Sequence, residues 1–495
     1  MTDRQVSRNA VLAVTQAVVS GVVLFLLYKF LLRTLGPERV GIWATVFAMA
    51  TAARISELGF TASTIRYTAQ HLARNDSKST IEMLQTVAIT IGIALPAILV
   101  ALFPLFLWLI KMSVPALHVR NAIVLLPYAL TSVWIGALAG VCLAGLDGCH
   151  RADLRALIGA ISSPVLLLLA WLLVPTHGLV GLAWAQIVQG VFMAAIGWIV
   201  LRRQLPDLPS SPRYWRYAYV REMLRYGVTF QAMAILTMLY EPVAKVLMAA
   251  LGGLAPAAYY DMAVRMVSQV RGLIISGIQV LVPKVADTHE RSPDEVHRVY
   301  ARTYLLVFYL ALPLYAALGA GIPLLSELLV GKIEAKFVTF SYLLCGGLAI
   351  NTITGPAYFV NVGTGALRWN LYGHIVIGVL NVVLSYLIGI EFGAIGVVCG
   401  SVAALVLGSG MTVLGYHVAN KISLRLLWSS DNAWLAAASL VAPVAAWSAS
   451  TIAPVPHQPV LSAALGFCVG VVPVVAAAWM HPLRRQVIPA LAAPR

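Results

Sequence analysis

Long apolar runs, separated by short polar segments, follow one another along almost the whole chain. A helix needs about 20 apolar residues to cross the hydrocarbon core of a bilayer. The alternating pattern of about ten residues that is typical of membrane β-strands is missing. The runs therefore predict fourteen transmembrane helices, near residues 11–34, 41–65, 83–110, 119–145, 153–174, 179–201, 223–250, 257–282, 300–329, 337–364, 370–389, 394–419, 433–453 and 459–480.

The composition supports an all-α membrane protein. Hydrophobic residues make up 60% of the chain and charged residues 11%, whereas a soluble domain carries about 25% charged residues. The first apolar run, which reaches Leu32, is longer than a signal-peptide core, so we interpret it as a retained helix. The five cysteines are scattered without a metal-binding spacing, which predicts neither a disulfide framework nor a metal, and we expect no cofactor.

Basic residues are distributed unevenly between the predicted loops. An even number of spans places both termini on one side, and that side receives 23 of the 34 Lys and Arg residues. The opposite loops hold Arg33, Arg39, Lys111, Arg120, Lys332 and Lys336. Because basic residues accumulate on the cytoplasmic side, we expect a multi-pass protein of the bacterial inner (cytoplasmic) membrane with both termini inside. The same rule explains the net charge of +15 without a nucleic-acid partner.

Short matches between the two halves of the chain indicate an internal duplication. Lys29 precedes Leu35-Gly36 by six residues, and Lys245 precedes Leu251-Gly252 by six. Arg54 matches Arg271 at a similar offset. So do Gln16-Ala17 and Gln231-Ala232, GCHRADL and GALRWNL, and GLVG at Gly178 and GAIG at Gly393; all the offsets lie between 215 and 217. Each repeat contains six helices, an even number, so both have the same orientation in the membrane.

The duplication predicts the domain organisation. We expect two six-helix lobes related by a pseudo-twofold axis along the membrane normal, with two extra helices at the C-terminal end. The predicted boundaries are 1–203 for the first lobe, 204–221 for a cytoplasmic linker, 222–420 for the second lobe and 421–495 for the two additional helices with a short tail.

Once the charged residues near the span ends are assigned to loops, five basic residues and three acids remain inside predicted spans, where an ionised side chain costs about 2.5–3.5 kcal/mol on insertion scales. They are Lys29, Arg54, Lys245, Arg265, Arg271, Glu57, Glu241 and Asp261. One interpretation is local pairing, because the three acids lie three or four residues from Arg54, Lys245 and Arg265, on the same helix faces. The other is a cationic chamber between the lobes, since Lys29 and Arg271 remain unpaired and surplus positive charge suits a phosphate or pyrophosphate.

Several segments resemble the Wzx-type polysaccharide flippases of the multidrug/oligosaccharidyl-lipid/polysaccharide exporter superfamily. They are LGPERVGIW…SELGFTASTIRY, LAGLDGCHRADLRALIG, LGGLAPAAYYDMAVRM, LVPKVAD and NVVLSYLIGIEFGAIGVVCG. The resemblance covers roughly residues 5–420. It implies a flippase for undecaprenyl-pyrophosphate-linked oligosaccharide units in O-antigen or exopolysaccharide synthesis. Cationic residues in a central cleft would receive the headgroup.

The resemblance leaves the energy source and the substrate open. We expect H⁺ or Na⁺ as the coupling ion, with Glu57 or Glu241 as its site, although the family more usually has Asp at the position of Glu57. Membrane lipid and a polysaccharide polymerase are the other expected partners. The alternatives are a flippase for a lipid-linked peptidoglycan precursor, a cation-coupled drug antiporter, and a membrane polymerase or ligase. Because no catalytic constellation or phosphate-binding loop is present, we expect no enzyme.

Overall fold

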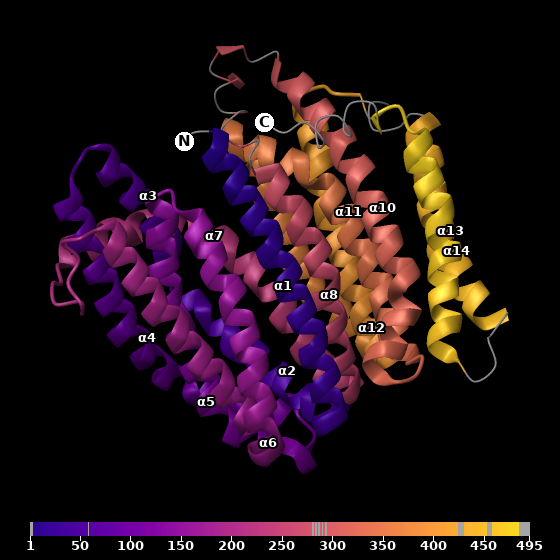
Figure 1. Ribbon diagram of the computed structural model, residues 1–495, viewed down its shortest axis with the longest axis horizontal. Coiled ribbons are helices and arrows are strands. Elements are labelled where there is room, and N and C mark those ends of the chain that lie inside the picture. Colours follow the sequence, from indigo (N-terminus) through magenta and orange to yellow (C-terminus); the bar gives the residue numbers. More distant parts are fainter. Residues whose placement is uncertain are drawn as a thin grey trace. The chain divides into compact units, whose positions relative to one another are not determined.

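The computed structural model describes residues 3–57, 59–279, 282, 285, 288–289, 291–292, 295–423, 430–452 and 458–484. Its elements, labelled in Figure 1, are α1 (Asp3–Leu35), α2 (Pro37–Ala52), the 3₁₀ turn η1 (Ala53–Glu57), α3 (Phe60–Ala73), α4 (Ser77–Ser113), α5 (Ala116–Gly148), α6 (Ala152–Gln204), α7 (Tyr217–Leu247), the π-helical turn η2 (Met248–Gly252), α8 (Leu254–Gln279), α10 (Val296–Val330), α11 (Ala335–Thr364), α12 (Arg368–Ala419), α13 (Ser430–Ile452) and α14 (Pro459–Met480).

These elements confirm the predicted all-α membrane fold. Within the described ranges, nine helices are long and apolar enough to cross a membrane. Helices α6 and α12 each contain two of the predicted spans, joined at a bend. The backbone bends at Gly178 (φ 58°, ψ −133°) and at Gly393 (φ 59°, ψ −134°) in almost the same way. Glycine adopts this conformation readily because it has no Cβ, so the matching GLVG and GAIG segments mark equivalent bends in the two repeats.

The one-residue change of offset along the repeat also has a structural cause. Gly36 (φ 77°) follows α1, and Gly253 (φ 95°) follows η2. These two glycines are 217 residues apart, whereas Lys29 and Lys245 are 216 apart. A π-helical turn takes up more residues than an α-helical turn, and η2 lies between Lys245 and Gly253. The second repeat therefore accommodates one extra residue at this turn.

The prediction of one continuous helix over residues 41–65 is wrong. Helix α2 ends at Ala52, η1 carries Arg54 and Glu57, and α3 begins at Phe60 after Gly59 in the left-handed conformation (φ 74°). The corresponding position in the second repeat is Ser276, which lies inside the uninterrupted helix α8. A residue with a Cβ enters the left-handed region only at a cost of about 1–2 kcal/mol, so the break depends on the glycine.

The chain forms two compact units, unit 1 (residues 1–258) and unit 2 (residues 259–495). Helix α7 packs against α2, α3 and α4 and so belongs to unit 1. The boundary between the compact units therefore lies within α8, whereas the predicted boundary between the repeats lies at the 204–221 linker. The repeat boundaries stay a prediction.

The linker is hydrogen-bonded to α4. Gln85 Oε1 accepts hydrogen bonds from the backbone N–H groups of Arg213 (2.9 Å) and Tyr214 (3.2 Å).

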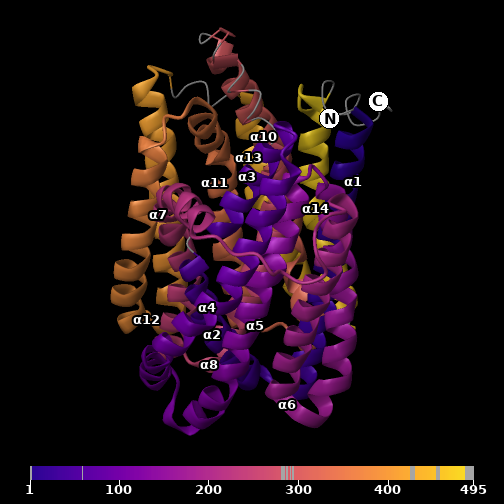
Figure 2. The ribbon, with the colours of Figure 1, turned by 90° about the vertical axis from the view of Figure 1, so that its left-hand side faces the viewer.

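Within unit 1, α5 and the second half of α6 pack side by side along their length (Figure 2). Glycines allow the close approach. A Cβ added at Gly190 would lie 2.9 Å from Ile135, and a Cβ added at Gly197 would lie 2.9 Å from Cys142. The partners advance in register along both segments, so the two segments run in parallel. Small residues at such seams let membrane helices gain van der Waals contact.

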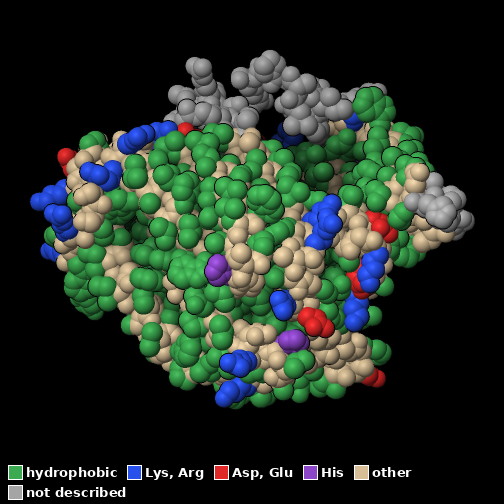
Figure 3. All heavy atoms as spheres, turned by 60° about the horizontal axis from the view of Figure 1, so that its bottom comes forward, with side chains coloured by type: hydrophobic (Ala, Val, Ile, Leu, Met, Phe, Trp, Pro, Cys, Tyr) green, Lys and Arg blue, Asp and Glu red, His purple; other side chains and the backbone are tan. Residues whose placement is uncertain are grey.

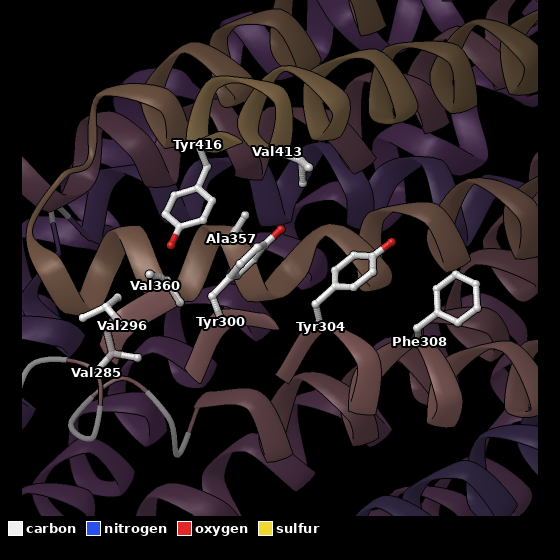
Figure 4. Packing of buried hydrophobic residues seen from close by; sticks show 9 residues of the cluster. All are labelled: Val285, Val296, Tyr300, Tyr304, Phe308, Ala357, Val360, Val413 and Tyr416. Atoms are coloured by element: carbon white, nitrogen blue, oxygen red, sulfur yellow. The ribbon is translucent and has the colours of Figure 1, made fainter. Parts of the chain in front are cut away.

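Aromatic side chains fill the core of unit 2. Figure 4 shows Tyr300, Tyr304 and Phe308 of α10 against residues of α11 and α12, among them Tyr416. The Tyr300 hydroxyl lies 2.8 Å from Nε2 of the buried His417. Helices α13 and α14 pack on the same α10. The last two helices therefore belong to the packed body of unit 2.

The bend in α12 gives a first testable prediction. Replacing Gly393 with Ala forces a side chain into a backbone conformation that costs about 1–3 kcal/mol for residues other than glycine. We expect G393A to unfold at a lower temperature than the wild type, measured by intrinsic fluorescence of the purified protein in detergent. Gly410→Ala is the matched control in the same helix, because an added Cβ there meets no atom within 4 Å. Equal midpoints for both variants would contradict the prediction.

Candidate functional site

Arg54 and Glu57 form an ion pair at the break in the second predicted span. Arg54 Nε lies 2.7 Å from Glu57 Oε1, and the Thr61 hydroxyl donates to Glu57 Oε2 at 3.3 Å. In a 3₁₀ turn, side chains three residues apart eclipse one another, which places both groups on one side of η1. The carboxylate side chain is 8% exposed and the guanidinium side chain 40%. The buried acid is therefore satisfied locally, while the base keeps an accessible face.

The other two acids are also paired with a base on the same helix. On α7, Lys245 Nζ donates to Glu241 Oε1; the lysine is buried and the glutamate is 46% exposed. On α8, Arg265 Nε lies 3.0 and 3.2 Å from the two carboxylate oxygens of the fully buried Asp261. Each pair brings one ionised group into the interior together with its counter-charge, which is the arrangement that intramembrane charges need.

Lys29 lies on α1 beside a pocket of 660 Å³ that α1 forms with the first half of α6. Arg33, one turn further along α1, lines the same pocket, and its walls are otherwise mostly apolar, with Leu168 and Trp171 on α6. In the described part of the chain, neither cation makes a hydrogen bond or an ion pair. We expected Arg33 in an outer loop; its four-residue spacing from Lys29 was the signal that could have assigned it to this pocket.

Arg271 is held by neutral groups from two other helices of unit 2. Its Nε donates to Asn351 Oδ1 on α11 at 2.9 Å, and Asn351 Nδ2 donates to the Ser409 hydroxyl on α12 at 2.8 Å. The guanidinium is also close enough to interact electrostatically with Tyr315 and His374. An amide fixes the side chain without neutralising it, so this position keeps a full positive charge.

An apolar groove of 740 Å³ lies in the same unit between α10, α11 and α13. Its lining residues include Leu312, Cys345, Leu440 and Trp447. Tyr315 lines this groove, and its hydroxyl lies 2.8 Å from that of Thr352, the residue after Asn351. Through Tyr315 and α11, the groove adjoins the polar network that holds Arg271. Unit 2 therefore offers a cation and a hydrocarbon-lined surface next to each other.

The candidate residues are divided between the units. Lys29, Arg54, Glu57, Glu241 and Lys245 lie in unit 1, and Asp261, Arg265 and Arg271 lie in unit 2. A cleft shared by the two lobes stays a prediction. Sequence reasoning missed Asn351 and Ser409, since a polar residue in an apolar run signals a bonding requirement but does not name a partner on another helix. Among the described residues, no three His, Cys, Asp or Glu side chains cluster so as to hold a metal ion.

The fold is similar to solved transporter structures. The lipid II flippase MurJ, in an inward closed conformation, matches with a TM-score of 0.76 and 12% identity, over 97% of this chain and 100% of that chain. A multidrug resistance MATE family transporter of the MOP superfamily, in an inward-facing conformation, matches with a TM-score of 0.68 and 17% identity, over 83% and 98%. A MOP superfamily transporter from Pyrococcus furiosus gives 0.57 and 16%, over 86% and 96%. No curated protein matches the chain.

The sequence itself identifies the family. The profile of the polysaccharide biosynthesis protein family matches residues 6–289, more than half of the chain. The resemblance to Wzx-type flippases and their exporter superfamily is thus confirmed at the level of family and fold. The chain belongs to the polysaccharide biosynthesis protein family and has the fold of the MOP superfamily transporters.

Proposed function

We propose that this protein is a flippase for undecaprenyl-pyrophosphate-linked oligosaccharide units, which it moves from the cytoplasmic to the periplasmic leaflet of a bacterial inner membrane. The product would supply O-antigen or exopolysaccharide synthesis. One observation carries the proposal: in unit 2, an arginine held by an amide adjoins an apolar groove. This pairing of features matches a ligand that has an anionic headgroup and a long hydrocarbon chain.

The charge state of Arg271 is the first step of the argument. Taking an ionised group out of water is unfavourable unless it is hydrogen-bonded and paired. Asn351 supplies a hydrogen bond but no counter-charge, and Ser409 continues the network with a neutral hydroxyl. A pyrophosphate would supply that charge, and the guanidinium fork binds phosphate oxygens in two parallel hydrogen bonds.

The groove is the second step. Burial of apolar surface contributes about 25 cal/mol per Å² removed from water, so a groove lined by aliphatic and aromatic side chains favours a hydrocarbon chain over a soluble sugar. Phe308, Leu312 and Trp447 are among its lining residues. A polyprenyl chain lying in or beside this groove would keep its phosphate end near Arg271.

Unit 1 supplies further cations for the same ligand class. Lys29 and Arg33 line one pocket, and Arg54 keeps an exposed face despite its bond to Glu57. In this proposal, alternating access by rocking of two lobes carries the headgroup across, and Lys245 and Arg265 join the cationic surface with their charges balanced by Glu241 and Asp261. Binding of H⁺ at Glu57 or Glu241, or of Na⁺, would weaken an ion pair and couple transport to an ion gradient.

The charge of the binding site separates some of the rival functions but not all of them. A flippase for a peptidoglycan precursor would use the same chemistry, and the likeness to MurJ favours it equally. A cation-drug antiporter, suggested by the MATE fold, fits less well because the acids in the described spans that bear on the site are paired while Lys29 and Arg271 lack a carboxylate partner. A polymerase or ligase is disfavoured because the similar structures are a transporter and a flippase; a separate polymerase would act on the product.

Substitution of the cations gives the direct test. In cells that depend on this protein for surface polysaccharide, we expect Arg271→Ala and Arg54→Ala each to reduce polymer output at least tenfold, because each removes a charge-assisted phosphate contact worth about 1.5–3 kcal/mol. Polymer is measured by gel electrophoresis at matched protein levels. Arg298→Ala is the control, since that side chain is 82% exposed at the start of α10. Normal polymer from both test variants would rule out the proposed site.

Asn351→Asp tests whether the positive charge at Arg271 must remain available. The new carboxylate would bond the guanidinium in place and neutralise it, so the fold should persist while affinity for a pyrophosphate falls about tenfold or more. The measurement is binding of undecaprenyl diphosphate to the purified protein in detergent, together with the unfolding midpoint. Asn420→Asp, at the exposed C-terminal end of α12, is the control. Unchanged affinity in N351D would show that Arg271 does not bind the anion.

A further inference from the structure

Unit 1 has a second pocket, separate from the residues assigned to transport. It measures 400 Å³ and lies where α2 begins, where α5 begins and where α6 bends. Arg39, Arg120, Asn121 and His177 provide its polar lining, and Val124 of α5 lies at its apolar side. We propose that this pocket binds the phosphate headgroup of an anionic membrane phospholipid, with an acyl chain along the α5–α6 seam.

The two arginines give the pocket an uncompensated positive charge. The nearby acid, Glu38, is directed to another base: its Oε2 lies 3.7 Å from Nε2 of His118. Over the ranges that the structure describes, Arg39 and Arg120 make neither hydrogen bonds nor ion pairs, and both are exposed. Two free guanidinium forks in one pocket match the oxygens of a phosphate diester.

The backbone reinforces this charge. Arg39 lies in the first turn of α2, Arg120 lies near the start of α5, and a new helical segment begins after the bend at Gly178. The N-terminal ends of helices carry positive partial charge and favour anions. Because α5 and the second half of α6 run in parallel, their starts lie at the same end of the seam, beside the pocket.

An apolar strip continues from the pocket along the same two helices. On α5 it consists of Val124 and Tyr128, and on α6 of Trp184, Val188 and Val191. The rings of Tyr128 and Trp184 have centroids 5.8 Å apart, and Val124 and Trp184 are 51% and 46% exposed. Tyr and Trp are enriched at membrane interfaces, where a headgroup gives way to its acyl chains.

Figure 3 views the end of the molecule at which α6 bends, and there Lys, Arg and His side chains lie in small groups on a largely hydrophobic surface. A polar ligand without a chain would leave the strip uncovered, and a zwitterionic lipid would bring a cationic group to the arginines together with its phosphate. An anionic phospholipid satisfies both features at once. The loops that carry Arg39 and Arg120 are expected on the outer side, so the outer leaflet would supply this lipid.

Native mass spectrometry of the purified full chain, titrated in detergent with phosphatidylglycerol or phosphatidylcholine, tests the proposal. Each basic residue near an anionic lipid contributes about fivefold in affinity, so we expect clear preference for phosphatidylglycerol and loss of that preference in Arg39→Gln/Arg120→Gln. Arg39→Lys/Arg120→Lys should retain most of it, since the charge is kept. The exposed Arg203→Gln is the control for a general loss of positive charge.

Three outcomes would overturn the proposal. They are equal affinity for the two lipids in the unaltered protein, a preference that survives in the double Gln variant, and tighter arginine-dependent binding of undecaprenyl diphosphate than of phosphatidylglycerol. The unfolding midpoint of each variant separates loss of the site from loss of the fold. Because the readout is lipid binding and not polymer output, it stands or falls independently of the transport function.

Discussion

The cost of placing ionised side chains in a hydrocarbon environment is the constraint on which the rest of this structure depends. Each acid in the candidate set meets a base on its own helix: Glu57 with Arg54, Glu241 with Lys245, and Asp261 with Arg265. These pairs cost little conformational entropy because a helical backbone already presents both partners on one face. Arg271 departs from this arrangement, since its hydrogen-bond partner is an amide from a different helix. Arg271 also lies in the unit that contains the apolar groove lined by Tyr315.

Glycine links this chemistry to the fold. The bends at Gly178 and Gly393 each join two helical spans, and Gly59 interrupts the second span so that Arg54 and Glu57 sit on a 3₁₀ turn. Along the α5–α6 seam, glycine removes side-chain bulk and lets the segments run closely in parallel. That parallel course brings helix starts together at the 400 Å³ pocket. Backbone freedom at a few positions thus decides where charged side chains can meet.

The described cationic features share one further property, which is their proximity to apolar surface. Lys29 and Arg33 lie in a mostly apolar pocket, Arg271 adjoins a groove, and Arg39 and Arg120 stand at the end of an exposed strip. A soluble anion would gain from the charges alone, whereas an amphiphilic anion gains from both surfaces. Charge and apolar surface thus lie together at each of these places, and this supports both proposals, in which the ligand is a lipid that carries phosphate.

The sequence by itself determined most of the helices and the local ion pairs, because each of these rests on spacing within one segment. A run of about 20 apolar residues predicts a span wherever it lies, and partners three or four residues apart meet on any helix. Tertiary structure decided the features that need several segments: the bond between Arg271 and Asn351, the groove lined by Tyr315, and the pocket that joins Arg39 to Arg120. The break after Ala52 also escaped prediction, since hydrophobicity continues through it and only the backbone at Gly59 reveals the turn. Contacts between distant segments depend on how helices pack, and an apolar pattern specifies that a face is buried without specifying its neighbour.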